Sequence, residues 1–319
     1  MTDLTILDLE PNTGNMLDEV VAGLSREEQK TLPCKYLYDE DGSRLFDRIC
    51  DLPEYYQTRT EMQIMRDNIA EIGRCVGDEA LLVEYGSGSS LKTRILLDEI
   101  DLLSGYVPID ISRWYVETSA RRLQKHYPDL EILPVVADYS TPIRMPEPEA
   151  NVNRRVAYFP GSTIGNFHPH EAIDFLMRVR DAMGEGGGLL LGVDLRKDPA
   201  VLHAAYNDSA GVTAAFNLGI LHRINRELDA DFDPDAFAHY APFNPGQGRI
   251  EMHLVSLKQQ VATVDGQSFE LDPGESIWTE CSYKYTLKGF ARVAARAGFS
   301  VQNVWTDADR LFSVQYLAC

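Results

Sequence analysis

A short glycine-containing stretch is the part of the sequence whose residue types first suggest chemistry. Residues 81–93, LLVEYGSGSSLKT, pass from an apolar run through a carboxylate to Gly86 and Gly88, and then into a helical pattern. A strand that turns through these glycines into a helix presents backbone N–H groups at the positive helix end, which suits a ligand with charge or many acceptors. The third glycine of a dinucleotide fingerprint is absent, and no Gly-Lys-Ser/Thr of a phosphate loop follows. The stretch therefore indicates a nucleotide-type site without identifying its ligand.

Three carboxylates stand at the ends of successive predicted strands. Glu84 ends the first strand, Asp110 ends the second, 24 positions after Gly86, and Asp138 ends the third. Ligands of open parallel sheets bind outside the carboxyl ends of the strands. We expect Asp110 to accept hydrogen bonds from ribose hydroxyls and Asp138 to accept one from an adenine amino group. A carboxylate before a helix is often only a helix cap, so Asp110 alone fits either role.

Apolar runs alternate with helical patterns in the middle of the chain. The predicted strands are residues 80–86, 105–111, 130–138, 154–161 and 188–195. Apolar residues recur near helical spacing in the intervening residues 90–100, 113–127 and 169–184. This βαβ succession with right-handed crossovers predicts a mostly parallel sheet.

The remaining segments depart from that alternation. Residues 214–228 read as a helix and residues 249–264 as an alternating strand, which together resemble an inserted unit that covers a substrate. Residues 286–299 predict a helix, and residues 300–307 and 311–319 predict a closing strand pair. Residues 1 to about 61 are irregular and rich in aromatic side chains, but too ordered in composition for a tail.

Length, charge and cysteine content limit the function. A chain of 319 residues with 44% hydrophobic residues is long enough for two domains with real cores. Its apolar runs are far shorter than the roughly 20 residues that span a bilayer, and the N-terminus lacks the features of a secretory signal, so we expect a cytoplasmic protein. The net charge of −19 argues against nucleic acid as a partner. Five scattered cysteines without a CxxC pair indicate neither a zinc site nor a disulfide framework.

Five parallel strands, a helix and a final strand pair are the arrangement of a class I S-adenosylmethionine (SAM) methyltransferase. The predicted fold class is therefore α/β, with a Rossmann-like SAM-methyltransferase sheet and a second, substrate-binding domain built from the N-terminal segment and the insertion. The SAM-binding domain is predicted to cover residues 62–196 and 287–319. The substrate-binding domain is predicted to cover residues 1–61 and 197–286.

Longer motifs carry a resemblance to one family. They are YDEDGSRLFDRICDLPEYYQTRTE, EYGSGSSLKTRILLD, GSTIGNFHP, AYNDSAGVTAAFNLGILHRINRELDADFD, RIEMHL and TECSYKY. They resemble the histidine N-alpha-methyltransferases of ergothioneine biosynthesis, whose relatives include fungal dimethylallyltryptophan N-methyltransferase. The resemblance runs from about Leu32 to the C-terminus. It implies three successive methyl transfers from SAM to the α-amino nitrogen of L-histidine, giving hercynine. We also expect no metal, no membrane partner and a monomer.

The resemblance also implies roles for individual residues. Lys92, after the glycine turn, would lie near the cofactor. Asn166 would bind the amino-acid backbone and Tyr206 its carboxylate. Tyr38 and Tyr55 would close the pocket, and the Tyr38 hydroxyl is the best group to accept or relay the amine proton. Met252, which is a core residue by default in an alternating strand, would form part of the pocket wall.

Substrate choice is predicted from TECSYKY. Glu280 and Ser282 are two apart on an extended segment, so their side chains face the same side. A carboxylate and a hydroxyl together satisfy the donor and the acceptor nitrogen of a neutral imidazole. The alternative is that Glu280 is a surface residue paired with Lys284.

Other functions remain open from the sequence alone. The same fold could methylate the α-amino group of another amino acid, such as a tryptophan derivative. Polar groups positioned to bind an imidazole would distinguish a histidine enzyme from this alternative. A catalytically silent SAM-binding module would not need Asn166 and Tyr206. A nucleotide-linked oxidoreductase is disfavoured by the incomplete glycine fingerprint and the final strand pair. The histidines His168 and His170 suggest a metal site, but no third ligand with suitable spacing is nearby.

Overall fold

The computed structural model describes residues 4–9, 16–88, 90–100, 102–139 and 141–319, and the chain divides into two units. The first unit comprises Met1–Asn12, Gln57–Arg196 and Tyr283–Cys319. The second comprises Thr13–Tyr56 and Lys197–Ser282. The divisions fall after residues 56, 196 and 282, where the sequence analysis expected 61, 196 and 286, and the N-terminal strand belongs to the first unit rather than the second.

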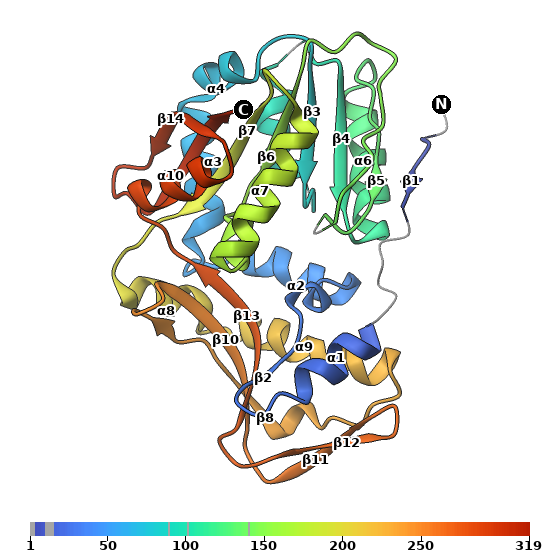
Figure 1. Ribbon diagram of the computed structural model, residues 1–319, viewed down its shortest axis with the longest axis vertical. Coiled ribbons are helices and arrows are strands. Elements are labelled where there is room, and N and C mark those ends of the chain that lie inside the picture. The colour runs from blue at the N-terminus through green and yellow to red at the C-terminus, as the bar shows by residue number, and fades with distance from the viewer. Residues whose placement is uncertain (1–3, 10–15, 89, 101, 140) are drawn as a thin grey trace. The chain divides into compact units, whose positions relative to one another are not determined.

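The first unit is built on one large sheet (Figure 1). In spatial order its described strands are β1 (Leu7–Asp8), β5 (Val135–Val136), β4 (Gly105–Asp110), β3 (Ala80–Tyr85), β6 (Arg154–Phe159), β7 (Gly188–Asp194), β15 (Phe312–Ala318) and β14 (Ser300–Thr306). The pairs from β1 to β7 are parallel, whereas β15 is antiparallel to both β7 and β14. This is the arrangement predicted for a class I SAM methyltransferase, and the fold class is confirmed.

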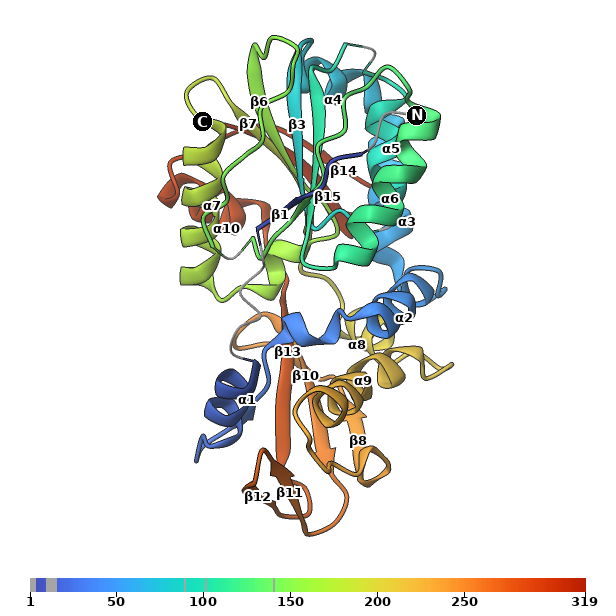
Figure 2. The same cartoon turned by 90° about the vertical axis from the view of Figure 1, so that its right-hand side faces the viewer.

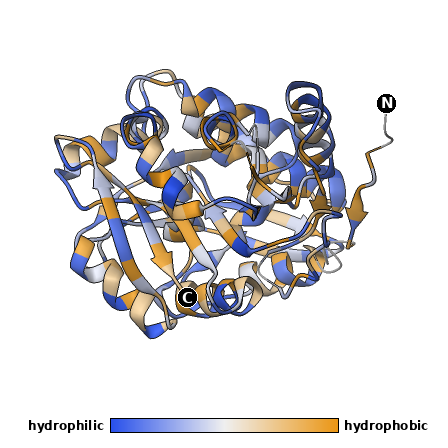
Figure 3. Cartoon of the chain, turned by 90° about the horizontal axis from the view of Figure 1, so that it is seen from above, coloured by the Kyte–Doolittle hydropathy of each residue, from blue (hydrophilic) through white to orange (hydrophobic). Residues whose placement is uncertain are grey.

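Helices cover both faces of this sheet. Figure 2 shows α5 (Leu91–Leu97) and α6 (Arg113–His126) on one face and α7 (Pro169–Met183) and α10 (Leu287–Arg296) on the other. The helices α3 (Tyr56–Asp67) and α4 (Ile69–Val76) precede the first central strand. Every residue of β3 and of β7 is buried, as a strand with helices on both sides requires. In Figure 3 the helical ribbons alternate orange and blue, which is typical of amphipathic helices that turn one face inward.

The second unit contains a smaller sheet and its own helices. The strands of the sheet follow the order β2 (Lys30–Thr31), β13 (Ser276–Tyr283), β10 (Arg249–Ser256) and β8 (Phe237–Tyr240), and β9 (Phe243–Asn244) also pairs with β10. The strands β11 (Gln260–Val264) and β12 (Gln267–Leu271) form a separate hairpin. The helices are α1 (Met16–Leu24), α2 (Glu40–Cys50), α8 (Pro199–Tyr206) and α9 (Val212–Glu227), with short 3₁₀ turns at Cys34–Leu37 and Pro234–Ala236. Alternate residues of β10, including Ile250, Met252 and Leu254, are buried.

Three predicted segments differ from the structure. The predicted strand 130–138 is reduced to β5 and an isolated bridge at Ile132, because Pro134 has no N–H to offer the ladder. The predicted strand 249–264 breaks after Ser256, whose hydroxyl donates to the Lys258 carbonyl as the chain turns into the hairpin. The N-terminal segment was expected to be irregular, and this was wrong: it holds α1 and α2, and Asp39 caps α2 by accepting from the Gly42 N–H.

No helix among the residues described above combines the length and the apolar character needed to cross a bilayer.

Candidate functional site

The glycine turn lies at the carboxyl edge of the parallel sheet. The N–H groups of Gly86 and Ser87 donate to the Ile109 carbonyl at 2.8 and 3.1 Å, and the Gly88 N–H donates to Asp110 Oδ2 at 3.1 Å. Gly86 and Gly88 have φ angles of +73° and +43°, a region that favours glycine. The turn therefore requires both glycines and places them beside the predicted carboxylate.

The same edge has polar groups suited to an adenosyl ligand. Ser87 Oγ is buried and has no hydrogen-bond partner among the described residues. Asp110 pairs with Val136 in the register of β4 and β5, so Asp138 follows at the same edge, with Tyr139 next to it. A ligand that reaches Ser87 would satisfy a hydroxyl that is otherwise orphaned. These residues fit the predicted cofactor.

Asp110 does not act as the cap of α6. The N-cap is Ser112, whose hydroxyl accepts from the Tyr115 N–H, and Asp110 Oδ1 instead accepts from the Ser112 N–H at 3.0 Å. Burial raises the pKa of Asp110, and the hydrogen bonds from the backbone N–H groups of Ser112 and Gly88 oppose that rise. The carboxylate is thus held against the glycine turn, as a ligand-binding group would be.

Glu84 is buried between the sheet and α5. Its side chain is 1% exposed, and its Oε2 accepts from Thr93 Oγ1 at 2.5 Å and from the Tyr106 hydroxyl. Burial raises the pKa of Glu84 to about 8, against the hydrogen bonds from Thr93 and Tyr106 that lower it. In the structure the carboxyl group ties α5 to β4 beneath the glycine turn. Direct contact of Glu84 with the cofactor stays a prediction.

Lys92 has a partner that the sequence analysis missed. Its ammonium pairs with Glu61 of α3, and the Glu61 side chain is 1% exposed. Both Glu61 oxygens also accept from the Gly161 N–H, at 3.0 and 2.9 Å. A Cβ on Gly192 would lie 2.1 Å from Glu61 Oε1, so β7 must carry glycine at this point. The available signal was the position of Glu61 as the last residue of the longest N-terminal motif.

The loop that carries Asn166 is fixed at several points. The Asp194 N–H donates to Ser162 Oγ at 2.9 Å, and Thr163 Oγ1 donates to the Pro160 carbonyl at 2.9 Å. A Cβ on Gly165 would lie 2.8 Å from the Tyr283 carbonyl oxygen, so only glycine permits this approach. Asn166 ends the 3₁₀ turn Thr163–Asn166 and is half-buried. Its predicted contact with substrate remains a prediction.

The second unit brings four of the predicted substrate residues together as two hydrogen-bonded pairs. The Tyr38 hydroxyl donates to Glu280 Oε2 at 3.2 Å, and the Tyr206 hydroxyl donates to Ser282 Oγ at 2.9 Å. Glu280 is 8% exposed, and Tyr206 and Ser282 are also buried. Glu280 and Ser282 of β13 thus each have a tyrosine hydroxyl beside them.

Aromatic rings surround these pairs. The Tyr38 ring lies 5.7 Å from that of Phe46 and 5.4 Å from that of Phe216, and the Tyr55 ring lies 6.2 Å from that of Tyr206. Met252 is buried on β10, and its carbonyl oxygen lies 3.1 Å from Thr279 Oγ1. Phe46 and Phe216 were not predicted. Phe46 lies in α2, a segment expected from the sequence to be irregular, and Phe216 has the sequence position of an ordinary core residue of α9.

The alternative role for Glu280 is wrong. Lys284 pairs with Asp194 at 2.8 Å, and neither of these two side chains is exposed. Glu280 is itself buried and contacts Tyr38. It is therefore not the surface partner of Lys284.

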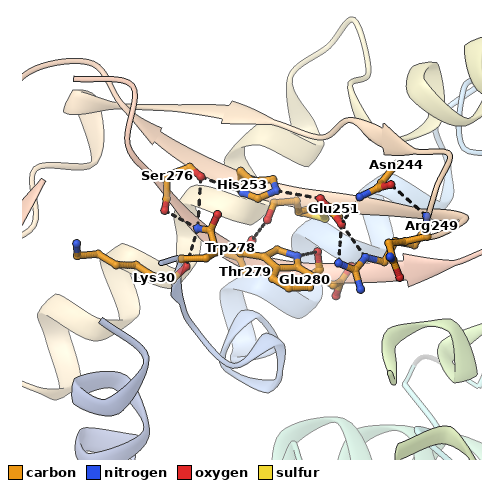
Figure 4. Close-up of polar contacts among 12 residues, drawn as sticks. Lys30, Asn244, Arg249, Glu251, His253, Ser276, Trp278, Thr279 and Glu280 are labelled. Atoms are coloured by element: carbon orange, nitrogen blue, oxygen red, sulfur yellow. Dashed lines mark hydrogen bonds and ion pairs between the residues drawn. The ribbon is translucent and has the colours of Figure 1, made fainter. Parts of the chain in front are cut away.

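A polar network on β10 and β13 fixes the neighbourhood of Glu280 (Figure 4). Trp278 Nε1 donates to the Glu280 carbonyl at 2.8 Å, and the Arg249 guanidinium lies 4.5 Å from the indole centroid. Glu251 accepts from Arg249 and from Asn244, and the Arg249 ion pair lowers the pKa of Glu251 against the effect of its burial. His253 lies beside Glu251 and contacts Ser276 Oγ at 3.1 Å. The Trp278 side chain, held by Arg249, therefore restrains the backbone of β13 at Glu280.

No group of three or more His, Cys, Asp or Glu side chains in the described part of the chain is arranged to hold a metal ion.

Comparison with known proteins gives a consistent result. Residues 16–319 match the model of a family described as histidine-specific, SAM-dependent methyltransferases. A histidine N-alpha-methyltransferase from Mycolicibacterium smegmatis is 43% identical over 295 residues, which cover 91% of this chain and 90% of that protein. Ergothioneine biosynthesis protein 1 of Neurospora crassa is 28% identical over 271 residues, covering 78% of this chain and 31% of that protein. A solved SAM-dependent methyltransferase from Clostridium acetobutylicum aligns with a TM-score of 0.49 and 11% identity, over 86% of this chain and 98% of that one.

The parallel sheet with its antiparallel closing pair, its glycine turn and its acidic strand ends define a class I SAM-dependent methyltransferase. The sequence matches go further, because they extend over nearly the whole chain. The chain belongs to the family of SAM-dependent, histidine-specific methyltransferases, and the resemblance stated from the sequence motifs is confirmed.

The buried pair of Glu61 and Lys92 gives a first prediction. Glu61→Gln or Lys92→Met alone leaves one buried charge without its partner, and each should lower the free energy of unfolding by about 3 kcal/mol or more. The double variant should lose clearly less than the sum of the two. Urea unfolding of the four proteins measures this cycle, and strictly additive losses would show that the two side chains do not interact.

A second prediction follows from the pKa of Glu84. This group has an ordinary pKa of 4.5 and a folded-state pKa of about 8, so between these values the folded chain binds more protons than the unfolded one. Its contribution to the free energy of unfolding must therefore fall as the pH rises through this window, by at most about 1.4 kcal/mol per pH unit. Glu84→Gln keeps an acceptor for Thr93 and Tyr106 and should gain stability relative to wild type as the pH rises from 5 to 8.5.

Unfolding midpoints of wild type, Glu84→Gln and the exposed control Glu185→Gln across that pH range test the second prediction. The control should follow the wild type throughout. A constant difference between wild type and Glu84→Gln at every pH would contradict the raised pKa.

Proposed function

We propose that the protein catalyses three successive methyl transfers from SAM to the α-amino nitrogen of L-histidine, giving hercynine, a step of ergothioneine biosynthesis. The observation that carries this proposal is the pair of buried contacts on β13, Tyr38 with Glu280 and Tyr206 with Ser282. A carboxylate and a hydroxyl on one strand are suited to the two ring nitrogens of a neutral imidazole. The names of the relatives support histidine as substrate and ergothioneine as the pathway.

The first unit is proposed to bind SAM. The glycine turn would pass along the methionine part, Asp110 would accept from the ribose hydroxyls and Asp138 from the adenine amino group. Glu84 accepts a hydrogen bond from Thr93, and Lys92 pairs with Glu61. These contacts hold the start of α5, which follows the glycine turn. When bound, the sulfonium supplies an electrophilic methyl group with a good leaving group already attached.

The chain's own task is to orient the amine and to exclude water. Tyr206 is proposed to bind the carboxylate of histidine, and Asn166 to orient the α-amino nitrogen in line with the methyl carbon. The Tyr38 hydroxyl, which donates to Glu280, is proposed to accept or relay the amine proton. Tyr55 and Met252 would enclose the amino acid with apolar surface. Three transfers need a nitrogen site whose contacts are few and adaptable, because the bulk on nitrogen grows at each step.

A third prediction concerns SAM. Asp110→Ala removes the proposed hydrogen bond to the ribose and should weaken SAM binding by roughly 1.5 to 3 kcal/mol, which is about tenfold to 150-fold. The matched control is Asp129→Ala, because Asp129 is an exposed aspartate in the connection after α6. Calorimetric titration with SAM should give wild-type affinity for the control. Wild-type affinity in Asp110→Ala would contradict the ribose assignment.

A fourth prediction concerns the amino acid. Wild type incubated with SAM and each of the twenty amino acids should methylate L-histidine and ignore tryptophan and phenylalanine. Phenylalanine has no ring nitrogen and tryptophan has only a donor N–H, so neither side chain would satisfy both Glu280 and Ser282, and sites of this kind discriminate by about 10⁴ or more. Mass spectrometry should find a product heavier by three methyl groups.

Variants of Glu280 sharpen this test. Glu280→Ala should lower kcat/KM for histidine strongly, and its combination with Met252→Val should shift the preference toward larger apolar rings. Glu270→Gln, at an exposed glutamate of β12, is the control and should keep wild-type efficiency. Equal efficiency of wild type on tryptophan and histidine would instead support the second candidate, α-N-methylation of a tryptophan derivative.

A further inference from the structure

His239 is a half-buried histidine of β8 that the proposed mechanism does not use. Its Nε2 lies 2.9 Å from the Tyr206 carbonyl oxygen, and its Nδ1 lies 3.0 Å from Asn217 Nδ2. Tyr206 is the last residue of α8, where backbone carbonyls lack partners within the helix. The imidazole therefore supplies a hydrogen bond that the helix end requires.

The orientation of the Asn217 amide follows from its other neighbours. Asn217 of α9 is completely buried, and its Nδ2 lies 3.1 Å from the His253 carbonyl oxygen. Its Oδ1 accepts from Thr279 Oγ1 at 2.6 Å. A carbonyl oxygen can only accept, so the NH₂ end of the amide must face His253, and its second hydrogen then points to His239 Nδ1.

These contacts leave one state for the His239 ring. Nδ1 must accept from Asn217, and Nε2 must donate to the Tyr206 carbonyl, so the ring is neutral with its proton on Nε2. Burial lowers the pKa of His239, and His253 adds to this effect, whereas the Tyr206 carbonyl and Asp208 oppose it. A protonated ring would direct an N–H at the Asn217 amide nitrogen.

The chain of contacts leads to Glu280 and Ser282 of β13, the two residues proposed to recognise the imidazole. At one end, Thr279 precedes Glu280 in the strand (Figure 4). At the other end, the Tyr206 main chain is held by His239, and its hydroxyl donates to Ser282. Two hydrogen bonds between the Asn207 side chain and the Ala241 backbone also hold this end of α8. Loss of the His239 imidazole is therefore not expected to unfold the helix.

We propose that His239, held in its neutral Nε2–H form by Asn217, is a positioning residue for the amino-acid site, because it fixes the main chain of Tyr206 and thereby places the Tyr206 hydroxyl against Ser282. This inference rests on the proposed function in taking Tyr206 and Ser282 as substrate-binding residues. The tautomer itself is independent of that function.

Two substitutions test the contributions of the two ring nitrogens of His239 separately. His239→Gln keeps a side-chain N–H at about the position of Nε2 and so retains the bond to the Tyr206 carbonyl. His239→Asn keeps only a polar atom near Nδ1. Steady-state kinetics with SAM and L-histidine should show a fivefold to tenfold rise in the KM for histidine in His239→Asn, as expected for one lost hydrogen bond, and recovery to within about twofold in His239→Gln.

The controls distinguish positioning from general damage. The KM for SAM should stay within about twofold of wild type in both variants, and His222→Asn, an exposed position of α9, should change neither constant. Wild-type KM for histidine in His239→Asn, equal rises in both His239 variants, or an equal rise in the KM for SAM would overturn the proposal.

The tautomer is tested without any substrate. In enzyme labelled with ¹⁵N-histidine, the signal that disappears in His239→Gln should show, at pH 7, a proton on Nε2 and none on Nδ1. A proton on Nδ1 would overturn the proposal even in an active enzyme. If the tautomer is as expected but wild type methylates no histidine, the proposed function fails while the state of His239 stands.

Discussion

The first unit depends on the buried carboxylate of Glu61. This group joins three segments that are far apart in sequence, because α3 supplies it, α5 supplies the Lys92 ammonium, and the loop after β6 supplies the Gly161 N–H. A charge so deeply buried is tolerated only when it is paired and hydrogen-bonded. Its space is kept open by Gly192 of β7. The segment that begins the glycine-turn helix and the segment that leads to Asn166 are thus positioned by one side chain.

In the second unit, the proposed substrate residues and the Tyr206 main chain contact hydroxyl, amide and imidazole groups. Glu280 and Ser282 each meet a tyrosine, and the Thr279–Asn217–His239 chain holds the backbone of Tyr206. Buried networks of this kind are rigid when every member is satisfied, and they are costly when one partner is lost. This property would suit the proposed amino-acid site, where recognition depends on the number and direction of hydrogen bonds.

Much of the first unit was predictable because its signals are local. Uninterrupted apolar runs separated by helical patterns located β3, β4, β6 and β7 to within two residues, and the glycine turn with Asp110 followed from the order of the strands. Pro134 shortened β5, which a count of apolar residues cannot foresee. The N-terminal helices were missed because α2 begins with acidic residues, glycine and serine, so its stability comes from the Asp39 cap and from packing. Glu61 and Phe216 were missed because Lys92 and Tyr38, which they contact, are remote from them in sequence.

Methyl transfer from a sulfonium requires orientation more than acid or base strength, and the structure reflects this requirement. The two carboxyl groups with the clearest pKa rises, Glu84 and Asp110, lie beneath or beside the glycine turn, where they hold α5 and the Gly88 N–H. On the proposed substrate side, the Tyr38 hydroxyl donates to Glu280, and Lys284 pairs with Asp194. We propose that recognition there also depends on the direction of hydrogen bonds, from Tyr38 to Glu280 and from Tyr206 to Ser282, rather than on a strong acid or base.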